Sequence, residues 1–195
     1  MIFCMFFVLH STIVNKKKNM NKKPDIITKQ LNRNGNYPNS RLPVIIYKRV
    51  ADSNKTSLDS YFEEMIHANK WGNSWRNGIY DYHHYHSTAH EVLAIYQGKA
   101  EVQLGGPGNE TFHLGKGDVV IIPSGVAHKR INSSDDFACF GAYPKGQSYD
   151  MNYGKEEELE EAIYNINHTP LPETDPVLGK DGPLKTTWNK KQKRV

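Results

Sequence analysis

The sequence predicts an all-β domain, an antiparallel barrel or sandwich, with one α-helix before it and one after it. Short runs of β-branched and aromatic residues recur between residues 71 and 143, separated by Gly-rich breaks. Strands at this spacing are typical of antiparallel sheets joined by turns rather than of βαβ units. Two amphipathic segments flank this region. A chain of 195 residues suffices for one well-buried domain with extensions, but hardly for two.

The charge of the chain is unevenly distributed. The formal net charge is +4, yet residues 1–24 and 184–195 together contribute ten basic residues and no acidic one. The remainder therefore carries 15 basic against 21 acidic residues. Because phosphate contacts require a basic face on the folded domain, this balance argues against a nucleic-acid partner.

The N-terminal stretch "MIFCMFFVL" is apolar, but nine residues are too few to span a bilayer. It lacks a basic segment before it and an A-x-A site after it. We expect residues 1–19 to be disordered or a start assigned too early, with Met20 opening the chain; a cleaved signal or short anchor is the alternative. Two cysteines, Cys4 and Cys139, form no disulfide framework or zinc ribbon, which favours a reducing compartment and hence a cytoplasmic protein. Because the apolar stretch is too short to span a bilayer, we expect no membrane partner.

The elements are expected in the following order. Residues 1–42 form an extension and an extended arm, and residues 43–150 form the barrel core. Within the core, "VIIYKRV" at 44–50 has strand character, and apolar residues at helical spacing predict an amphipathic helix in "SLDSYFEEMIHANK". The further predicted strands are "GIYDYHHYH", "EVLAIYQ", "KAEVQL", "ETFHL", "DVVIIP", "KRIN" and "FACFGAYP".

The C-terminal part is predicted in two pieces. Residues 151–188 comprise an amphipathic helix in "GKEEELEEAIYNIN" and a Pro- and Gly-rich segment that wraps the domain without regular structure. Residues 189–195 are expected to be a disordered tail.

A histidine cluster, "HHYHSTAHE" at residues 83–91, holds four of the nine histidines. Side chains at i and i+2 of a strand point to one face about 6.7 Å apart, so His84 and His86 can lean toward one point. The residues "STAH" have the length of a tight reversal. Glu91 then opens the next strand, where its carboxylate can return beside the two imidazoles.

A third histidine, His128, follows an apolar strand and a Pro-Ser-Gly turn, which can present it on an adjacent strand. Three neutral nitrogens and one carboxylate oxygen suit one divalent transition metal (Fe, Mn, Ni, Cu or Zn) and poorly suit Ca(II) or Mg(II). With four protein ligands, an octahedral ion keeps two positions for water, dioxygen or a bidentate substrate.

Two spaced motifs carry a family resemblance. The pattern G-x5-H-x-H-x4-E-x6-G is matched by Gly78, His84, His86, Glu91 and Gly98. The pattern G-x5-P-x-G-x2-H-x3-N is matched by Gly117, Pro123, Gly125, His128 and Asn132. In both motifs the chain resembles a cupin, and its flanks are similar to uncharacterised bacterial single-domain cupins. The resemblance implies a double-stranded β-helix (jelly-roll) barrel, a metal inside its wider mouth, and often a homodimer.

Several aromatic residues precede the first motif. Tyr80 and Tyr82 share the inward parity of His84, so they can line the pocket, although inward aromatics more commonly fill a barrel. Tyr82 is our first candidate for a catalytic acid–base group. Trp71 and Trp75 are expected to pack on the barrel wall rather than to cap its mouth.

Other polar residues near the ligands have less direct roles. His83 and His90 should face away from the metal, which favours a position behind the metal ligands or on the surface. A register slip that exchanges His90 for Glu91 is the alternative. Asn132, the last residue of the second motif, is placed in the pocket or behind the ligands.

Two functions fit this sequence. The first is a mononuclear metal-dependent oxygenase or isomerase that acts on a small polar or carbonyl-containing molecule. The second is a non-catalytic module that binds a small ligand or metal. The intact ligand set argues against a metal-free nucleotide-sugar epimerase. No DNA-reading segment accompanies the barrel, which favours the enzyme over a sensor.

Overall fold

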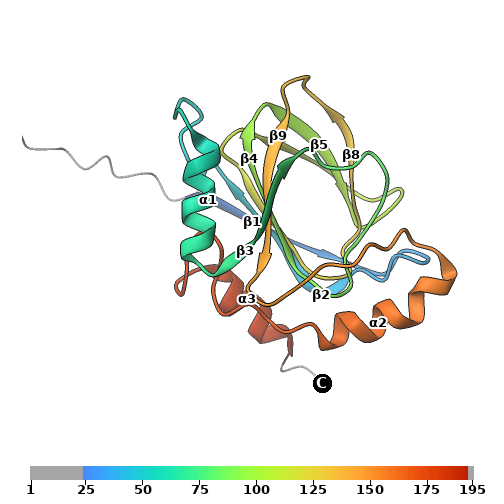
Figure 1. The fold of residues 1–195 in the computed structure, drawn as a ribbon. Coiled ribbons are helices and arrows are strands. Elements are labelled where there is room, and N and C mark those ends of the chain that lie inside the picture. Colours follow the sequence, from blue (N-terminus) through green and yellow to red (C-terminus); the bar gives the residue numbers. More distant parts are fainter. Residues whose placement is uncertain (1–23, 193–195) are drawn as a thin grey trace, which may run out of the picture.

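The computed structural model describes residues 24–192, which form a barrel of antiparallel strands with helices outside it (Figure 1). The strands are β1 (Asp25–Leu31), β2 (Ser40–Lys48), β3 (Trp71–Asn77), β4 (Glu91–Gln97), β5 (Lys99–Leu104), β6 (Thr111–Gly115), β7 (Val119–Ile122), β8 (His128–Ser133) and β9 (Ala138–Pro144). The helices are α1 (Leu58–Ala68), α2 (Leu159–His168), α3 (Pro183–Gln192) and a 3-10 turn at Glu156–Glu158.

The strands form two sheets, one with the order β1-β2-β7-β4-β9-β3 and one with the order β6-β5-β8. Every pairing within them is antiparallel, which confirms the predicted all-β jelly-roll class. Within residues 24–192, no helix has the length and apolar character needed to cross a membrane.

The central strands of the larger sheet are buried on both faces, as β4 illustrates. Leu93 and Ile95 point into the barrel, where they join the core between the two sheets. Val92 and Ala94 point outward into a second core that α1 and α3 cover. This double burial explains why the strand reads as a continuous apolar run rather than as an alternating one. Glu91 lies on the same inward face as Leu93 and Ile95.

The C-terminal segment differs from the prediction. Residues from Pro183 onward form α3 instead of an irregular wrap, because Leu184 and Trp188 lie four residues apart and are both buried on one helix face. The Trp188 indole also donates to the carbonyl of Pro43 at 2.9 Å. α3 extends to Gln192, into the segment 189–195 that is predicted to be a disordered tail; residues 193–195 lie outside the described part.

Two other segments also differ. The predicted arm is part of the larger sheet, since β1 pairs along β2; residues 1–19 lie outside the described part. The segment 78–86 is not a continuous strand: His84 forms an isolated bridge with His128, and Tyr85 forms one with Asn152. Since His84 and Tyr85 pair with two different segments of the chain, no continuous ladder of strand hydrogen bonds forms.

Candidate metal centre

Three imidazoles meet inside the barrel mouth. His84, His86 and His128 are all buried, and one ring nitrogen from each lies within 4.8 Å of the other two. Two backbone hydrogen bonds join His84 and His128, at 2.9 and 3.2 Å, and they place the two rings 4.1 Å apart. The backbone bridge thus brings together histidines that lie 44 positions apart in the sequence.

The turn before His128 is fixed by a glycine. Gly125 adopts φ +88°, and its N–H donates to the carbonyl of His86 at 2.7 Å. A Cβ on Gly125 would lie 2.4 Å from the carbonyl oxygen of Asn39, so both the backbone angle and the space require glycine. This turn ties His128 to His86.

Hydrogen bonds determine which nitrogen of each ring faces inward. The Nδ1 atom of each of the three histidines lies against a backbone carbonyl, which can only accept a hydrogen bond. The accepting carbonyls are those of Tyr82, Asp150 and Val126, at 3.2, 2.5 and 3.2 Å. Nδ1 therefore carries the proton, and the Nε2 lone pairs point toward one another. Such carbonyl contacts commonly orient metal-binding histidines.

Glu91 completes the centre. Its Oε2 lies 3.3 Å from Nε2 of His128 and 3.7 Å from Nε2 of His86. Glu91 is 2% exposed, and Oε2 has no hydrogen-bond partner. A buried carboxylate oxygen is costly unless a donor or a cation satisfies it. Three imidazole nitrogens and this oxygen form a donor set that fits a divalent transition metal.

The other oxygen of Glu91 is held by Tyr143, which the sequence analysis missed, and Trp75 supports Tyr143 from the cavity wall. Tyr143 donates its hydroxyl to Glu91 Oε1 at 2.9 Å, and the indole of Trp75 donates to that hydroxyl at 3.0 Å. A Cβ on Gly141 would lie 2.2 Å from the Trp75 ring, so glycine leaves room for the indole. Because Tyr143 shares the parity of Cys139 on β9, strand alternation could have placed it inward.

Asp150 is a second missed residue. Its backbone carbonyl accepts a hydrogen bond from Nδ1 of His86, and its carboxylate accepts the N–H groups of Ser87 and Thr88 at 2.6 and 3.3 Å. These bonds fix the turn that follows His86. No sequence pattern pointed to Asp150, since it lies 64 residues from His86 in an irregular segment.

The buried groups shift one another's pKa values. Burial, and then the neighbouring His128, lowers the pKa of His84 to about 3. Burial would raise the pKa of Glu91, but the imidazoles of His86 and His128 outweigh it and hold the pKa below its usual range. Burial opposes protonation of His86 as well, yet Glu91 raises its pKa. Without a cation, a proton therefore favours the space between His86 and Glu91, and a metal would compete with it.

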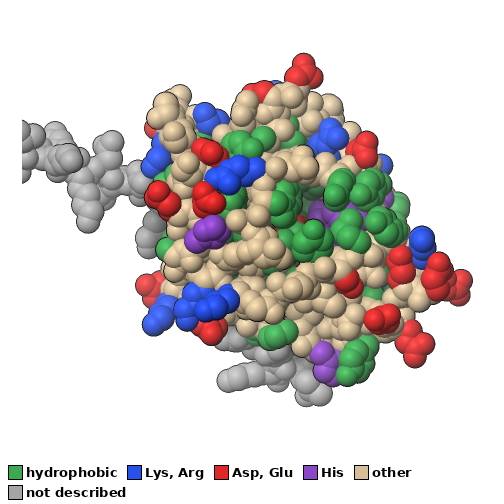
Figure 2. Space-filling view, in the orientation of Figure 1, with side chains coloured by type: hydrophobic (Ala, Val, Ile, Leu, Met, Phe, Trp, Pro, Cys, Tyr) green, Lys and Arg blue, Asp and Glu red, His purple; other side chains and the backbone are tan. Residues whose placement is uncertain are grey.

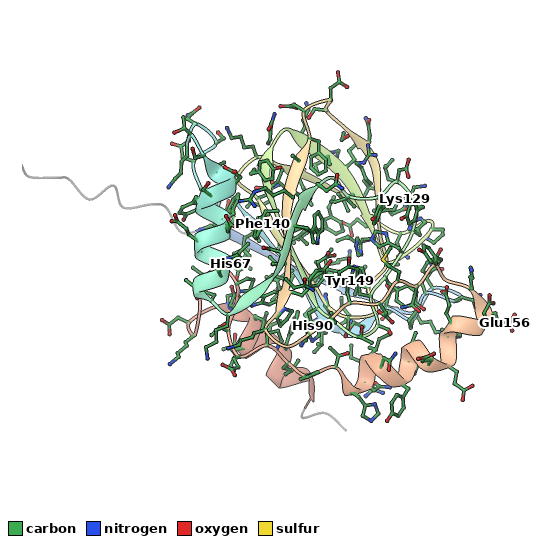
Figure 3. The ribbon with its side chains drawn as sticks, in the orientation of Figure 1. His67, His90, Lys129, Phe140, Tyr149 and Glu156 are labelled. Atoms are coloured by element: carbon green, nitrogen blue, oxygen red, sulfur yellow. The ribbon has the colours of Figure 1, made fainter. Side chains whose placement is uncertain are left out.

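The centre opens into a cavity of about 270 Å³ that reaches the surface of the barrel mouth. Figure 2 shows histidine side chains inside a hollow that hydrophobic side chains surround. Its walls include Trp75, Ile79, Leu93 and Tyr149. Tyr149 lies at the barrel opening (Figure 3), so a small molecule can reach the imidazoles past it.

Comparison with known proteins agrees with the two motifs. A family model described as "Cupin domain" matches residues 77–140. A curated relative, "Uncharacterized protein YjlB" of Bacillus subtilis (strain 168), is 40% identical over 155 residues, which cover 80% of this chain and 90% of the relative. This chain belongs to the cupin family.

Several solved structures are similar to this cupin. Acireductone dioxygenase from Bacillus anthracis, with a cadmium ion in its active centre, is 17% identical over 53% of this chain and 70% of its own, with a TM-score of 0.39. A mutant of Bacillus subtilis oxalate decarboxylase OxdC is 23% identical over 57% of this chain and 28% of its own, with a TM-score of 0.35. Pumpkin seed globulin is 20% identical over 50% and 28%, with a TM-score of 0.34.

Of the remaining predicted site residues of this cupin, some line the cavity and others lie outside it. Tyr80 lines the cavity, whereas Tyr82 stacks on Tyr80 at the rim, at 4.9 Å, and is not part of the cavity wall. His83 faces the ring of Tyr37, at 5.6 Å, away from the imidazoles. Asn132 is exposed on β8 and lines a different hollow beside β5 and β6, so the structure does not bring it to the cavity.

His90 also faces away, as expected from its parity. Its Nδ1 accepts the N–H of Ser124 at 2.9 Å, and its ring lies 4.8 Å from Trp188 of α3. Figure 3 shows it on the side of the larger sheet where α3 packs. The exchange of His90 for Glu91 through a register slip is therefore wrong, because Glu91 pairs opposite Ile122 with its side chain inward.

Proposed function

We propose that this cupin is a mononuclear metal-dependent enzyme, of oxygenase or isomerase type, that acts on a small polar molecule. One divalent transition metal (Fe, Mn, Ni, Cu or Zn) would be held by His84, His86, Glu91 and His128. The convergence of three inward Nε2 atoms on an unpartnered buried carboxylate oxygen, beside an accessible cavity, carries this proposal.

The metal, when bound, would act as a Lewis acid or activate dioxygen. The protein's own groups would hold the ligands and control protons around them. Burial and the Glu91 carboxylate raise the pKa of Tyr143, so its hydroxyl stays protonated and keeps donating to Glu91. The acid–base role of Tyr82 stays a prediction; its ring lies 5.6 Å from that of His84, at the rim.

The alternative is a cupin that binds a metal or small ligand without converting it. The same four residues would then hold the metal, so ligand geometry does not distinguish the two functions. Only a measurement of substrate turnover distinguishes them. A metal-loaded protein that consumes no dioxygen and converts no member of a small-molecule library would favour the binding module.

The test begins with elemental analysis of the full chain, purified without a histidine tag or chelator. We expect about one equivalent of a transition metal per chain, and its loss in Glu91→Ala and His128→Ala at retained fold by circular dichroism. Iron would favour oxygenase chemistry, and zinc or manganese would shift weight toward isomerase or binding roles. A metal-free protein that cannot be reconstituted would contradict the proposal.

A homodimer and a cytoplasmic location complete the proposal. The homodimer rests on the family resemblance, and the location rests on the low cysteine content. Light scattering on the untagged chain tests the first, and cell fractionation tests the second. A monomer at micromolar concentration would contradict the dimer.

A further inference from the structure

Exposed tyrosines surround the entrance to the cavity. Tyr80, Tyr82, Tyr149 and Tyr153 are 51%, 39%, 45% and 43% exposed. The rings of Tyr80, Tyr82 and Tyr153 contact one another in succession, and Tyr80 and Tyr149 line the cavity. Exposed apolar surface of this kind commonly marks a binding site. Because these rings adjoin the candidate metal centre, the surface indicates what enters it.

One side of the entrance is built on Tyr149. Its ring stacks on that of Tyr143 at 4.7 Å, with an angle of 24° between the planes, and lies 4.9 Å from the ring of His86. Tyr149 also lines the cavity. An aromatic surface therefore begins directly beside a candidate metal ligand and extends outward.

A second aromatic pair consists of Tyr80 and Tyr82. Their rings stack at 4.9 Å with an interplanar angle of 19°, and the rings of Tyr80 and His84 lie 5.2 Å apart and nearly perpendicular. Tyr80 lines the same cavity as Tyr149. Flat aromatic surfaces thus adjoin two different candidate ligands of the metal.

The rest of the cavity wall combines apolar side chains with the polar residues Arg76 and Asn77. Trp75, Ile79, Leu93 and Met151 are among its lining residues. The one arginine in the wall, Arg76, has its guanidinium in ion pairs with acidic residues of α1. Those ion pairs join Arg76 to Glu63 and Asp59, at 2.7 and 3.7 Å. The wall therefore offers a ligand aromatic and aliphatic surface beside the four candidate metal ligands.

We propose that the ligand of this site is a planar unsaturated ring that carries two adjacent oxygen donors. This inference rests on the proposed function, since the oxygens would chelate the metal while the ring packs between Tyr80 and Tyr149. A cavity of about 270 Å³ is small for a ligand pocket, which suits a single ring better than a larger scaffold.

The test compares two probes with one chelating group. Benzohydroxamate and acetohydroxamate bind a metal through the same two oxygens and differ only in phenyl against methyl. Their dissociation constants are measured by calorimetry on the metal-loaded full chain and compared with those for the free metal ion. We expect the protein to prefer benzohydroxamate by about tenfold beyond the solution ratio, because each aromatic contact strengthens binding about two- to tenfold.

Two rim variants show whether the tyrosines cause this preference. Tyr149→Leu and Tyr80→Leu should each reduce it about two- to tenfold while metal content and acetohydroxamate binding stay unchanged. Tyr164→Leu is the matched control, since Tyr164 is an exposed tyrosine on α2, outside the cavity wall.

The outcomes separate this inference from the proposed function. Retained metal with no preference for the ring, or a preference that both rim variants keep, overturns the inference alone. A chain that binds neither metal nor hydroxamate overturns both. A ring preference without turnover of any ring-bearing chelator supports the inference and favours the binding module.

Discussion

Two buried carboxylates of this cupin invite comparison, because each is paired with a buried tyrosine hydroxyl. Asp175, in the C-terminal segment, accepts from Tyr47, and Glu91, in the barrel, accepts from Tyr143. They are 0% and 2% exposed. Burial and the adjoining carboxylate raise the pKa of both tyrosines. By burial and charge alone the two sites look alike.

They differ in how many of their oxygens are satisfied. Asp175 accepts the N–H groups of Val177 and Leu178 on Oδ1, at 2.8 and 3.1 Å, and that of Leu184 on Oδ2 at 3.3 Å. Glu91 uses only Oε1 in a hydrogen bond, and its Oε2 faces imidazole nitrogens that are themselves acceptors when the rings are neutral. A saturated carboxylate holds a fold together, whereas an unsaturated one that faces further acceptors is arranged for a cation.

Asp175→Ala should give the largest effect on stability. The change leaves the Tyr47 hydroxyl and three backbone N–H groups without their acceptor, which costs about 3–5 kcal/mol in the free energy of unfolding. Denaturant titration of the metal-free protein measures it. Asp181→Ala, at an exposed position in the same segment, is the control. If Asp175→Ala lost metal at unchanged stability, the structural role of Asp175 would be wrong.

Glu91→Gln should have the opposite profile. The amide keeps an acceptor for Tyr143 and adds an N–H donor among the imidazoles, so the metal-free protein should keep its stability. Metal affinity should fall by about 100-fold or more, since even residues behind the ligands contribute about 10- to 100-fold. Competition with a chromophoric chelator measures the affinity. Equal affinity in the variant and the parent would show that Glu91 is not a ligand.

A pH series separates the two regions by means of His90, which adjoins Glu91 in sequence but contacts α3. Burial lowers the pKa of His90 to about 3, so the unfolded chain binds this proton first as pH falls below about 6.5. Stability is then lost with falling pH, by about 2 kcal/mol from this residue between pH 8 and 5. His90→Asn keeps an acceptor for Ser124 and should flatten the stability–pH curve by that amount. An unchanged curve would contradict a neutral buried His90.

The two regions also differ in how far their structure could be predicted from sequence. Strand periodicity and motif spacing predict the barrel and the convergence of His84, His86, Glu91 and His128. These depend on local alternation and on one strand pairing, both of which leave a pattern in the sequence. The hydrogen bonds that satisfy Asp175 depend on the backbone of its own loop folding around it. The helix α3 depends on packing against β2. The loop leaves no periodic pattern in the sequence, and α3 leaves only the single i, i+4 pair of Leu184 and Trp188.

Tyr143 lies between these cases, because its inward parity could be predicted but its partners could not. Trp75 donates to the Tyr143 oxygen, so the Tyr143 proton is directed to Glu91 Oε1 and Oε2 is left toward the imidazoles. Tyr143→Phe removes this bond, and we expect a decrease of about tenfold in metal affinity. Replacing the ligand Glu91 should lower metal affinity further, because that change removes a donor atom, whereas Tyr143→Phe only makes the Glu91 carboxylate less firmly held.

Trp75→Phe provides the graded comparison for that prediction. It removes the indole donor but leaves Tyr143 bonded to Glu91, so the decrease in metal affinity should be smaller than for Tyr143→Phe. Chelator competition on both variants gives the order, with the metal-free stability of each measured alongside it. If Trp75→Phe weakened metal binding more than Tyr143→Phe, the indole would act through the shape of the cavity wall rather than through the Tyr143 hydroxyl.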